Sequence, residues 1–126
     1  MKRLILAVCL ATGTVSGQDS KSTALLSKDL ADIAGKEATM STVEYAPGRE
    51  GTVHRHNAHV FVYVLEGSIV MQVRGGKEVT LGPGGTFYEG PMDVHTVGRN
   101  ASKTQPAKFL VFAIKDKGAP LVVPAK

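Results

Sequence analysis

Short apolar runs separated by glycine-rich turns are the feature that most constrains the fold of this chain. The sequence contains 14 glycines, which cluster between Gly48 and Gly98. Runs rich in valine and aromatic residues, such as 59–67 and 107–115, lie between the turns. Such residues favour strands, and several short strands with regular turns are typical of a sandwich or barrel. The pattern predicts an all-β fold.

The strands can be placed from alternation and from turn residues. Residues 36–46 alternate well enough for a strand, with Ser41, Val43 and Tyr45 on one face. Residues 68–81 resemble a hairpin around Gly75 and Gly76. The remaining predicted strands are 52–56, 59–67, 86–91, stopped by Pro91, 94–100 and 107–115. The sequence shows no repeat, no linker and no second domain.

Residues 1–17 have the features of an export signal. Lys2 and Arg3 are followed by an apolar stretch, 4–11, that is too short to span a bilayer. Small residues at 15–17 favour cleavage before Gln18, which would place the protein in the periplasm or outside the cell. The alternative is a short buried or anchoring N-terminal helix. Cys9, the single cysteine, lies in this segment, so the mature chain would have no disulfide and no thiolate ligand.

We assign residues 18–36 to an N-terminal arm and residues 37–126 to the folded domain. Within the arm, 23–33 has leucines and isoleucine on one side of a helix, with Ser22 as a possible N-cap. The segment could equally be an extended arm that docks on a partner subunit. The tail after Lys115 could extend across a partner or end on the surface.

The charge of the chain gives little evidence for a polyanionic partner. The formal net charge is +4, from 15 basic and 11 acidic residues. Loss of Lys2 and Arg3 with a signal would leave 13 basic residues and a net charge of +2. Because these residues are scattered, we expect no nucleic-acid partner. We also expect no membrane span.

Three of the four histidines, His54, His56 and His59, lie close together, and His95 lies on another predicted strand. Side chains two apart on a strand point the same way, so the rings of His54 and His56 can converge. Two neutral imidazoles suit Zn, Fe, Mn, Ni or Cu. A histidine pair alone is weak evidence, because surface or hydrogen-bonded histidines show the same spacing.

Two motifs in this chain resemble those of the cupins. Residues 47–67 resemble the first cupin motif, with His54 and His56 on its histidines and Gly67 on its closing glycine. Residues 84–100 resemble the second, with His95 on its histidine and Asn100 on its asparagine. The resemblance implies a double-stranded β-helix, or jelly-roll β-barrel, for the domain. It further implies a divalent metal, a small-molecule ligand and a homodimer.

The chain departs from the first motif at one metal ligand. The glutamate of the motif falls at Val60, which cannot bind a metal. His59 lies one residue earlier, and the turn at Asn57 and Ala58 could reset its facing. His59 could therefore replace the missing carboxylate. It could also be a rim residue or a general acid or base. In the second motif, the Pro-x-Gly of the cupin pattern is replaced by Gly90-Pro91-Met92, so the proline and the glycine are displaced.

The sequence thus predicts one metal site and several candidate pocket residues. The predicted ligands are His54, His56, His95 and His59, for a divalent Fe, Mn, Ni, Cu or Zn ion. Glu89, which could complete a metal site or act as a base, Tyr88 and Arg99 are pocket candidates, although such residues are more often on the rim or the surface. Arg55 is a further candidate for an anionic ligand.

Three functions remain open from the sequence. The first is a metal-dependent enzyme on a small organic molecule, with dioxygenase-like, isomerase or lyase chemistry. The second is a non-catalytic periplasmic module that binds a small ligand or a metal. The third is a structural barrel that dimerises. The fold does not decide between them.

Overall fold

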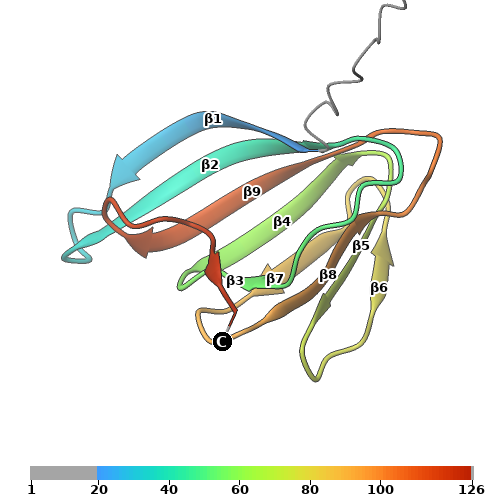
Figure 1. The fold of residues 1–126 in the computed structure, drawn as a ribbon. Coiled ribbons are helices and arrows are strands. Elements are labelled where there is room, and N and C mark those ends of the chain that lie inside the picture. The colour runs from blue at the N-terminus through green and yellow to red at the C-terminus, as the bar shows by residue number, and fades with distance from the viewer. Residues whose placement is uncertain (1–19, 126) are drawn as a thin grey trace, which may run out of the picture.

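The computed structural model describes residues 20–125, which form ten strands and no α-helix. The strands are β1 (Ser20–Asp29), β2 (Lys36–Tyr45), β3 (His54–Arg55), β4 (His59–Glu66), β5 (Ile69–Val73), β6 (Val79–Leu81), β7 (Thr86–Glu89), β8 (His95–Asn100), β9 (Ala107–Asp116) and β10 (Val123–Pro124). They form two five-stranded antiparallel sheets, in the orders β1-β2-β9-β4-β7 and β10-β3-β8-β5-β6 (Figure 1). The predicted all-β fold, a double-stranded β-helix, is confirmed.

The core lies between the sheets and follows from strict alternation in the central strands. Along β4 the inward residues Val60, Val62 and Val64 are buried, whereas the residues between them are exposed. β9 shows the same period of two. The sheet β10-β3-β8-β5-β6 has the shorter strands and is the smaller sheet, and the other is the larger sheet. Ile69 and Met71 of β5 close the core from the smaller sheet. The other predicted strands and the hairpin of 68–81 are confirmed, whereas the strand predicted over 52–56 is limited to His54–Arg55. Ser41, Val43 and Tyr45, predicted to share one face of their strand, line the cavity described below.

The predicted helix over 23–33 is wrong, because residues 20–29 form β1. This strand pairs antiparallel with β2 along nearly its whole length. A bulge between Ala24 and Leu26 breaks the register, and Leu30 and Ile33 lie beyond the end of β1, in the turn before β2. Nine of its ten residues are exposed, and backbone pairing with β2 therefore decides its conformation. The segment is extended, and it pairs with its own chain.

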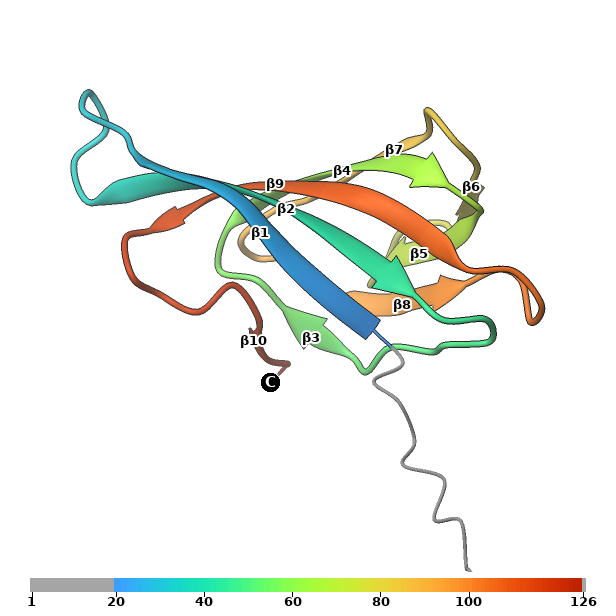
Figure 2. The ribbon, with the colours of Figure 1, turned by 90° about the horizontal axis from the view of Figure 1, so that it is seen from above.

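The tail after β9 returns to the sheet that carries the histidines, where β10 is an edge strand beside β3 (Figure 2). Lys115 anchors its start, because the buried ammonium group donates to Glu37 Oε1 at 2.5 Å and to the carbonyl of Ala119 at 2.6 Å. The hydrogen bond from Lys115 lowers the pKa of Glu37 below its ordinary value. β10 then pairs with β3, the strand that carries His54. The tail therefore belongs to the wall around the histidines.

Two sequence predictions lie outside the described residues: the export signal over 1–17 and the place of Cys9. Within residues 20–125, no helix has the length and apolar character needed to cross a membrane.

Candidate metal centre

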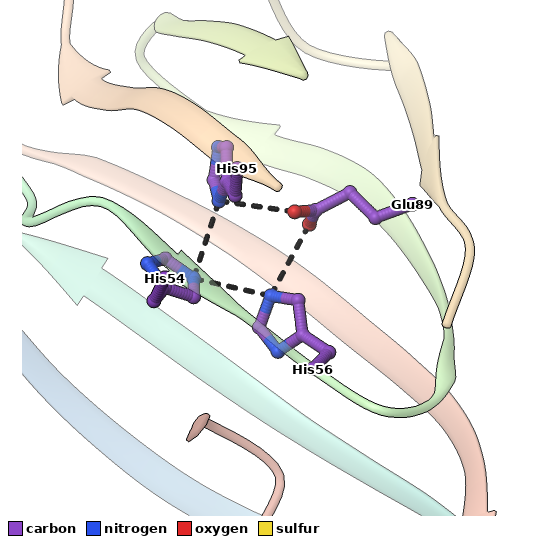
Figure 3. Close-up of side chains that lie close together, drawn as sticks. All are labelled: His54, His56, Glu89 and His95. Carbon is purple, nitrogen blue, oxygen red and sulfur yellow. Dashed lines mark hydrogen bonds and ion pairs between the residues drawn. The ribbon is translucent and has the colours of Figure 1, made fainter. Parts of the chain in front are cut away.

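Three histidines and one glutamate, contributed by both sheets, converge on one another (Figure 3). His54 lies on β3 and His56 directly follows it, while Glu89 ends β7 and His95 begins β8. One ligand atom from each residue can be chosen so that all four lie within 4.8 Å of one another. Metal–ligand bonds of about 2.2 Å would separate ligands on opposite sides of one ion by about 4.4 Å. The group is therefore compact enough to hold a metal.

The hydrogen bonds of two histidines fix the tautomer that each ring has in its neutral form. His54 Nδ1 lies 2.8 Å from the carbonyl of Thr52, and His56 Nδ1 lies 3.0 Å from the carbonyl of Leu121. A carbonyl only accepts, so both Nδ1 atoms carry the proton in the neutral rings. The two Nε2 atoms then present lone pairs to each other at 3.1 Å. A cation between them would turn this repulsion into coordination.

Glu89 supplies the single carboxylate of the group. Its side chain is 2% exposed, with Oε2 3.4 Å from His56 Nε2 and Oε1 3.1 Å from His95 Nδ1. The contact between Glu89 Oε1 and His95 Nδ1 lacks hydrogen-bond geometry, so Oε1 has no hydrogen-bond partner among the described residues. A buried carboxylate oxygen without a donor is costly. A metal ion would satisfy it.

His95 is held in its metal-binding form by burial. Its ring is 3% exposed and packs against Gly98, where an added Cβ would lie 2.7 Å from the ring. Burial lowers the pKa of His95 below its ordinary value, and this effect exceeds the opposing effect of the Glu89 carboxylate. The neutral imidazole, which is the form that binds metals, is therefore favoured.

Glu89 lies directly opposite Val60, the position on which the motif glutamate falls. Val60 of β4 and Glu89 of β7 are direct cross-strand partners. Both are buried on the inner face of the sheet. Residues directly opposite each other have Cβ atoms about 5 Å apart, so a carboxylate at either position reaches the same part of the barrel.

The structure does not bring His59 into this group. His59 begins β4 on the exposed face of the larger sheet, opposite in direction to Val60. Its Nδ1 lies 2.7 Å from the hydroxyl of Tyr88, which is also exposed on that outer face. Asn57 has a positive φ of 47° at the turn, but this turn leaves His59 on the outside. His59 and Tyr88 thus pair with each other, away from the centre.

The two arginines considered from the sequence also lie outside the group. Arg99 pairs with Glu78 at 3.7 Å, and Arg55 donates to the side chain of Asn57 at 3.3 Å. Neither lines the cavity beside the histidines. Sequence reasoning missed Arg49, which does line this cavity, because an arginine in a Pro-Gly turn ordinarily faces solvent.

A cavity of about 270 Å³ adjoins the four ligands. Its walls combine small polar side chains with apolar ones, and Val122 and Leu121 of the tail contribute to it. This volume is close to the lower end of the range for small-molecule sites. The centre therefore opens onto a space that a small ligand could enter.

The comparisons with known proteins agree with this geometry. The Cupin_2 family model, described as a cupin domain, matches residues 41–113. This chain is a cupin. No curated protein matches it significantly.

Solved structures similar to this cupin share its fold at low identity. A double-stranded β-helix protein from Klebsiella pneumoniae is 17% identical with a TM-score of 0.67, and the match covers 88% of each chain. DMSP lyase DddQ from Ruegeria pomeroyi is 22% identical with a TM-score of 0.62, covering 70% of this chain and 43% of the lyase. A recombinant oxalate oxidase is 24% identical with a TM-score of 0.64, covering 87% of this chain and 57% of the oxidase. The cupin thus spans less than two thirds of either enzyme.

The tail of this cupin orients His56, one of the four candidate ligands, and its removal is expected to weaken any binding of a metal by this group. Deleting residues 120–126 removes the Leu121 carbonyl that accepts from His56 Nδ1. We expect metal affinity to fall by about tenfold, because partners that orient a ligating histidine typically contribute 10–100-fold. Chelator competition measures the change. Leu121→Gly, which keeps the carbonyl but loses the apolar contact, should retain most of the affinity. Equal affinities for the deletion and the full chain would contradict this role.

Proposed function

We propose that this cupin binds one divalent transition metal through His54, His56, His95 and Glu89, and that the metal acts on a small organic molecule in the adjoining cavity. The observation that carries the proposal is the pair of facing Nε2 lone pairs, 3.1 Å apart. Both protons of this pair are committed to backbone carbonyls on the far side of the rings. Three neutral histidines and one carboxylate suit Fe, Mn, Ni, Cu or Zn.

The cavity favours a reactive centre over a closed structural one. Structural metal sites are usually closed by protein ligands, whereas catalytic sites keep a position for water or substrate. Here the four ligands form part of the cavity wall. A metal bound there would supply Lewis-acid or redox chemistry to a ligand in the cavity. DMSP lyase and oxalate oxidase, two of the similar structures, are enzymes by their names, and we extend this analogy to a dioxygenase-like, lyase or isomerase reaction here.

Elemental analysis of the purified full chain tests the metal claim. We expect about one equivalent of a transition metal per chain, retained through dialysis and restored after chelation and reloading. His59→Ala is a matched control, because it removes a histidine from the outer face, and its metal content should be unchanged. A wild-type chain that takes up no transition metal under any loading condition would rule the proposal out. Loss of the metal in His59→Ala would instead return His59 to the ligand set.

We also propose export and homodimer formation. Export is inferred from residues 1–17 alone. The dimer is supported by aromatic side chains on the outer face of the larger sheet, where Phe61, Tyr63 and Tyr88 are 43–47% exposed, since contiguous exposed apolar surface often marks an interface. N-terminal sequencing of the protein from its native host tests the first proposal, and a chain beginning at Met1 would refute it. Sedimentation analysis tests the second, which a monomer at high concentration would refute.

A further inference from the structure

Arg49 lies in the same cavity as the candidate metal centre. It belongs to the turn between β2 and β3, and its backbone is held from both sides. Its N–H donates to the carbonyl of Ala46 at 3.1 Å, and its own carbonyl accepts from the N–H of Asn100 at 3.0 Å. The side chain lines the cavity together with His54, His56, His95 and Glu89. A fixed backbone therefore presents a cation to this space.

The guanidinium group has a packed face and unpaired edges. Its central carbon lies 4.3 Å from the centroid of the Tyr45 ring, which is a cation–π distance. Nε and Nη1 are buried and have no hydrogen-bond partner among the described residues. Arg49 is also absent from the ion pairs within residues 20–125. Buried donors without an acceptor carry a desolvation cost, and an anionic ligand would relieve it.

The charges of the cavity favour the same kind of ligand. Among its lining residues, Glu89 is the single acid and Arg49 the single arginine or lysine. Glu89 faces the histidines and would be a metal ligand. A divalent ion, one carboxylate and one guanidinium would leave a net charge of +2 in a partly apolar cavity. Charges in such surroundings interact more strongly than in water.

We infer that Arg49 is an anion-binding residue, and that the cavity takes a small organic carboxylate between Arg49 and the metal centre. The inference rests on the proposed metal site for one end of the ligand. The fork of an arginine matches the planar geometry of a carboxylate. Phosphate is less suitable, because its greater charge is usually met by several donors such as a helix N-terminus, and residues 20–125 contain no helix. The volume of about 270 Å³ restricts the ligand to a small molecule.

Calorimetric titration with dicarboxylates and their monoamides tests this inference. The probes are malonate, succinate, glutarate and adipate, each compared with the monoamide of the same length, with inorganic phosphate as a further arm. We expect at least one dicarboxylate to bind the metal-loaded wild type about tenfold or more tightly than its monoamide, because charge-assisted bonds are stronger than neutral ones. Arg49→Gln should lose this preference and keep its metal content. Arg49→Lys should retain part of it, since the charge remains and the fork is lost.

The outcomes separate this inference from the metal proposal. Equal binding of each acid and its monoamide by wild type, or an undiminished preference in Arg49→Gln, would overturn it. Tighter binding of phosphate than of any carboxylate would overturn the ligand class. If Arg49→Gln fails to fold in thermal melts, Arg49→Lys and the wild-type preference decide. The titrations are repeated on metal-free protein, where a carboxylate preference that depends on Arg49 would support the anion subsite even if the metal proposal fails.

Discussion

Replacing Glu89 with glutamine is expected to lower the affinity of this cupin for a transition metal by at least about 100-fold. Residues that merely orient metal ligands contribute 10–100-fold, and a charged ligand should contribute more. Glu89 is the single acid lining the cavity. In Glu89→Gln, no other carboxylate of the cavity wall therefore balances the positive charge of the ion. Competition with a chromophoric chelator, using Zn and Ni or Co, measures the affinity of each variant.

A second measurement distinguishes a lost ligand from a lost fold. In metal-free protein Glu89 is a buried carboxylate, one oxygen of which has no hydrogen-bond partner within residues 20–125, and this is unfavourable. Glu89→Gln should therefore keep the melting temperature of the metal-free wild type, or raise it. Glu66→Gln is a matched control, because Glu66 is an exposed acid at the end of β4. An affinity for Glu89→Gln equal to that of the Glu66 control would remove Glu89 from the site.

Asn100→Ala is expected to reduce the free energy of unfolding by about 2–4 kcal/mol, because it removes a buried amide that bonds several part-buried backbone groups at once. Asn100 is 4% exposed. Its Nδ2 lies 2.7 Å from the carbonyl of Gln105 and 3.1 Å from that of Ala46, and its Oδ1 accepts from the N–H of Ser102 at 2.9 Å. The side chain of Asn100 thus connects the loop after β8 to the turn after β2, which contains Arg49. Urea unfolding followed by circular dichroism measures the change.

Gln72→Ala is the matched control for Asn100. Gln72 is also an amide that donates to a backbone carbonyl, that of Gly76 at 2.9 Å, but this bond is exposed. Its loss should cost less than about 0.5 kcal/mol, as for most surface substitutions. A similar small effect in Asn100→Ala would show that water replaces the bonds of Asn100 and that the residue does not brace the two loops.

The strands could be predicted because their burial is regular. The valine- and aromatic-rich run 59–67 predicted a strand, and β4 forms there with every second valine buried, because a pleated strand directs alternate side chains to opposite faces. β1 could not be predicted, because nine of its ten residues are exposed and the leucines and isoleucine of 25–33 have a spacing that also suits a helix. Its conformation depends on backbone hydrogen bonds to the edge of β2, and a turn separates β2 from β1 in the sequence. The local pattern of apolar residues predicts a strand poorly where neither face of that strand is buried.

The residues of the candidate site also fall into those that the sequence predicted and one that only the structure placed. His54 and His56 converge because they lie two residues apart, and the second motif identified His95; the sequence by itself therefore determined the fold class and the three histidines. Only the tertiary structure decided the fourth member. His59 is the nearer residue in sequence, but alternation along β4 directs it outward, whereas Glu89 reaches the inner face from the neighbouring strand, directly opposite Val60. The physical reason is that strand pairing joins positions that are far apart in the chain, so a carboxylate can move to another strand and still occupy the same point in the barrel.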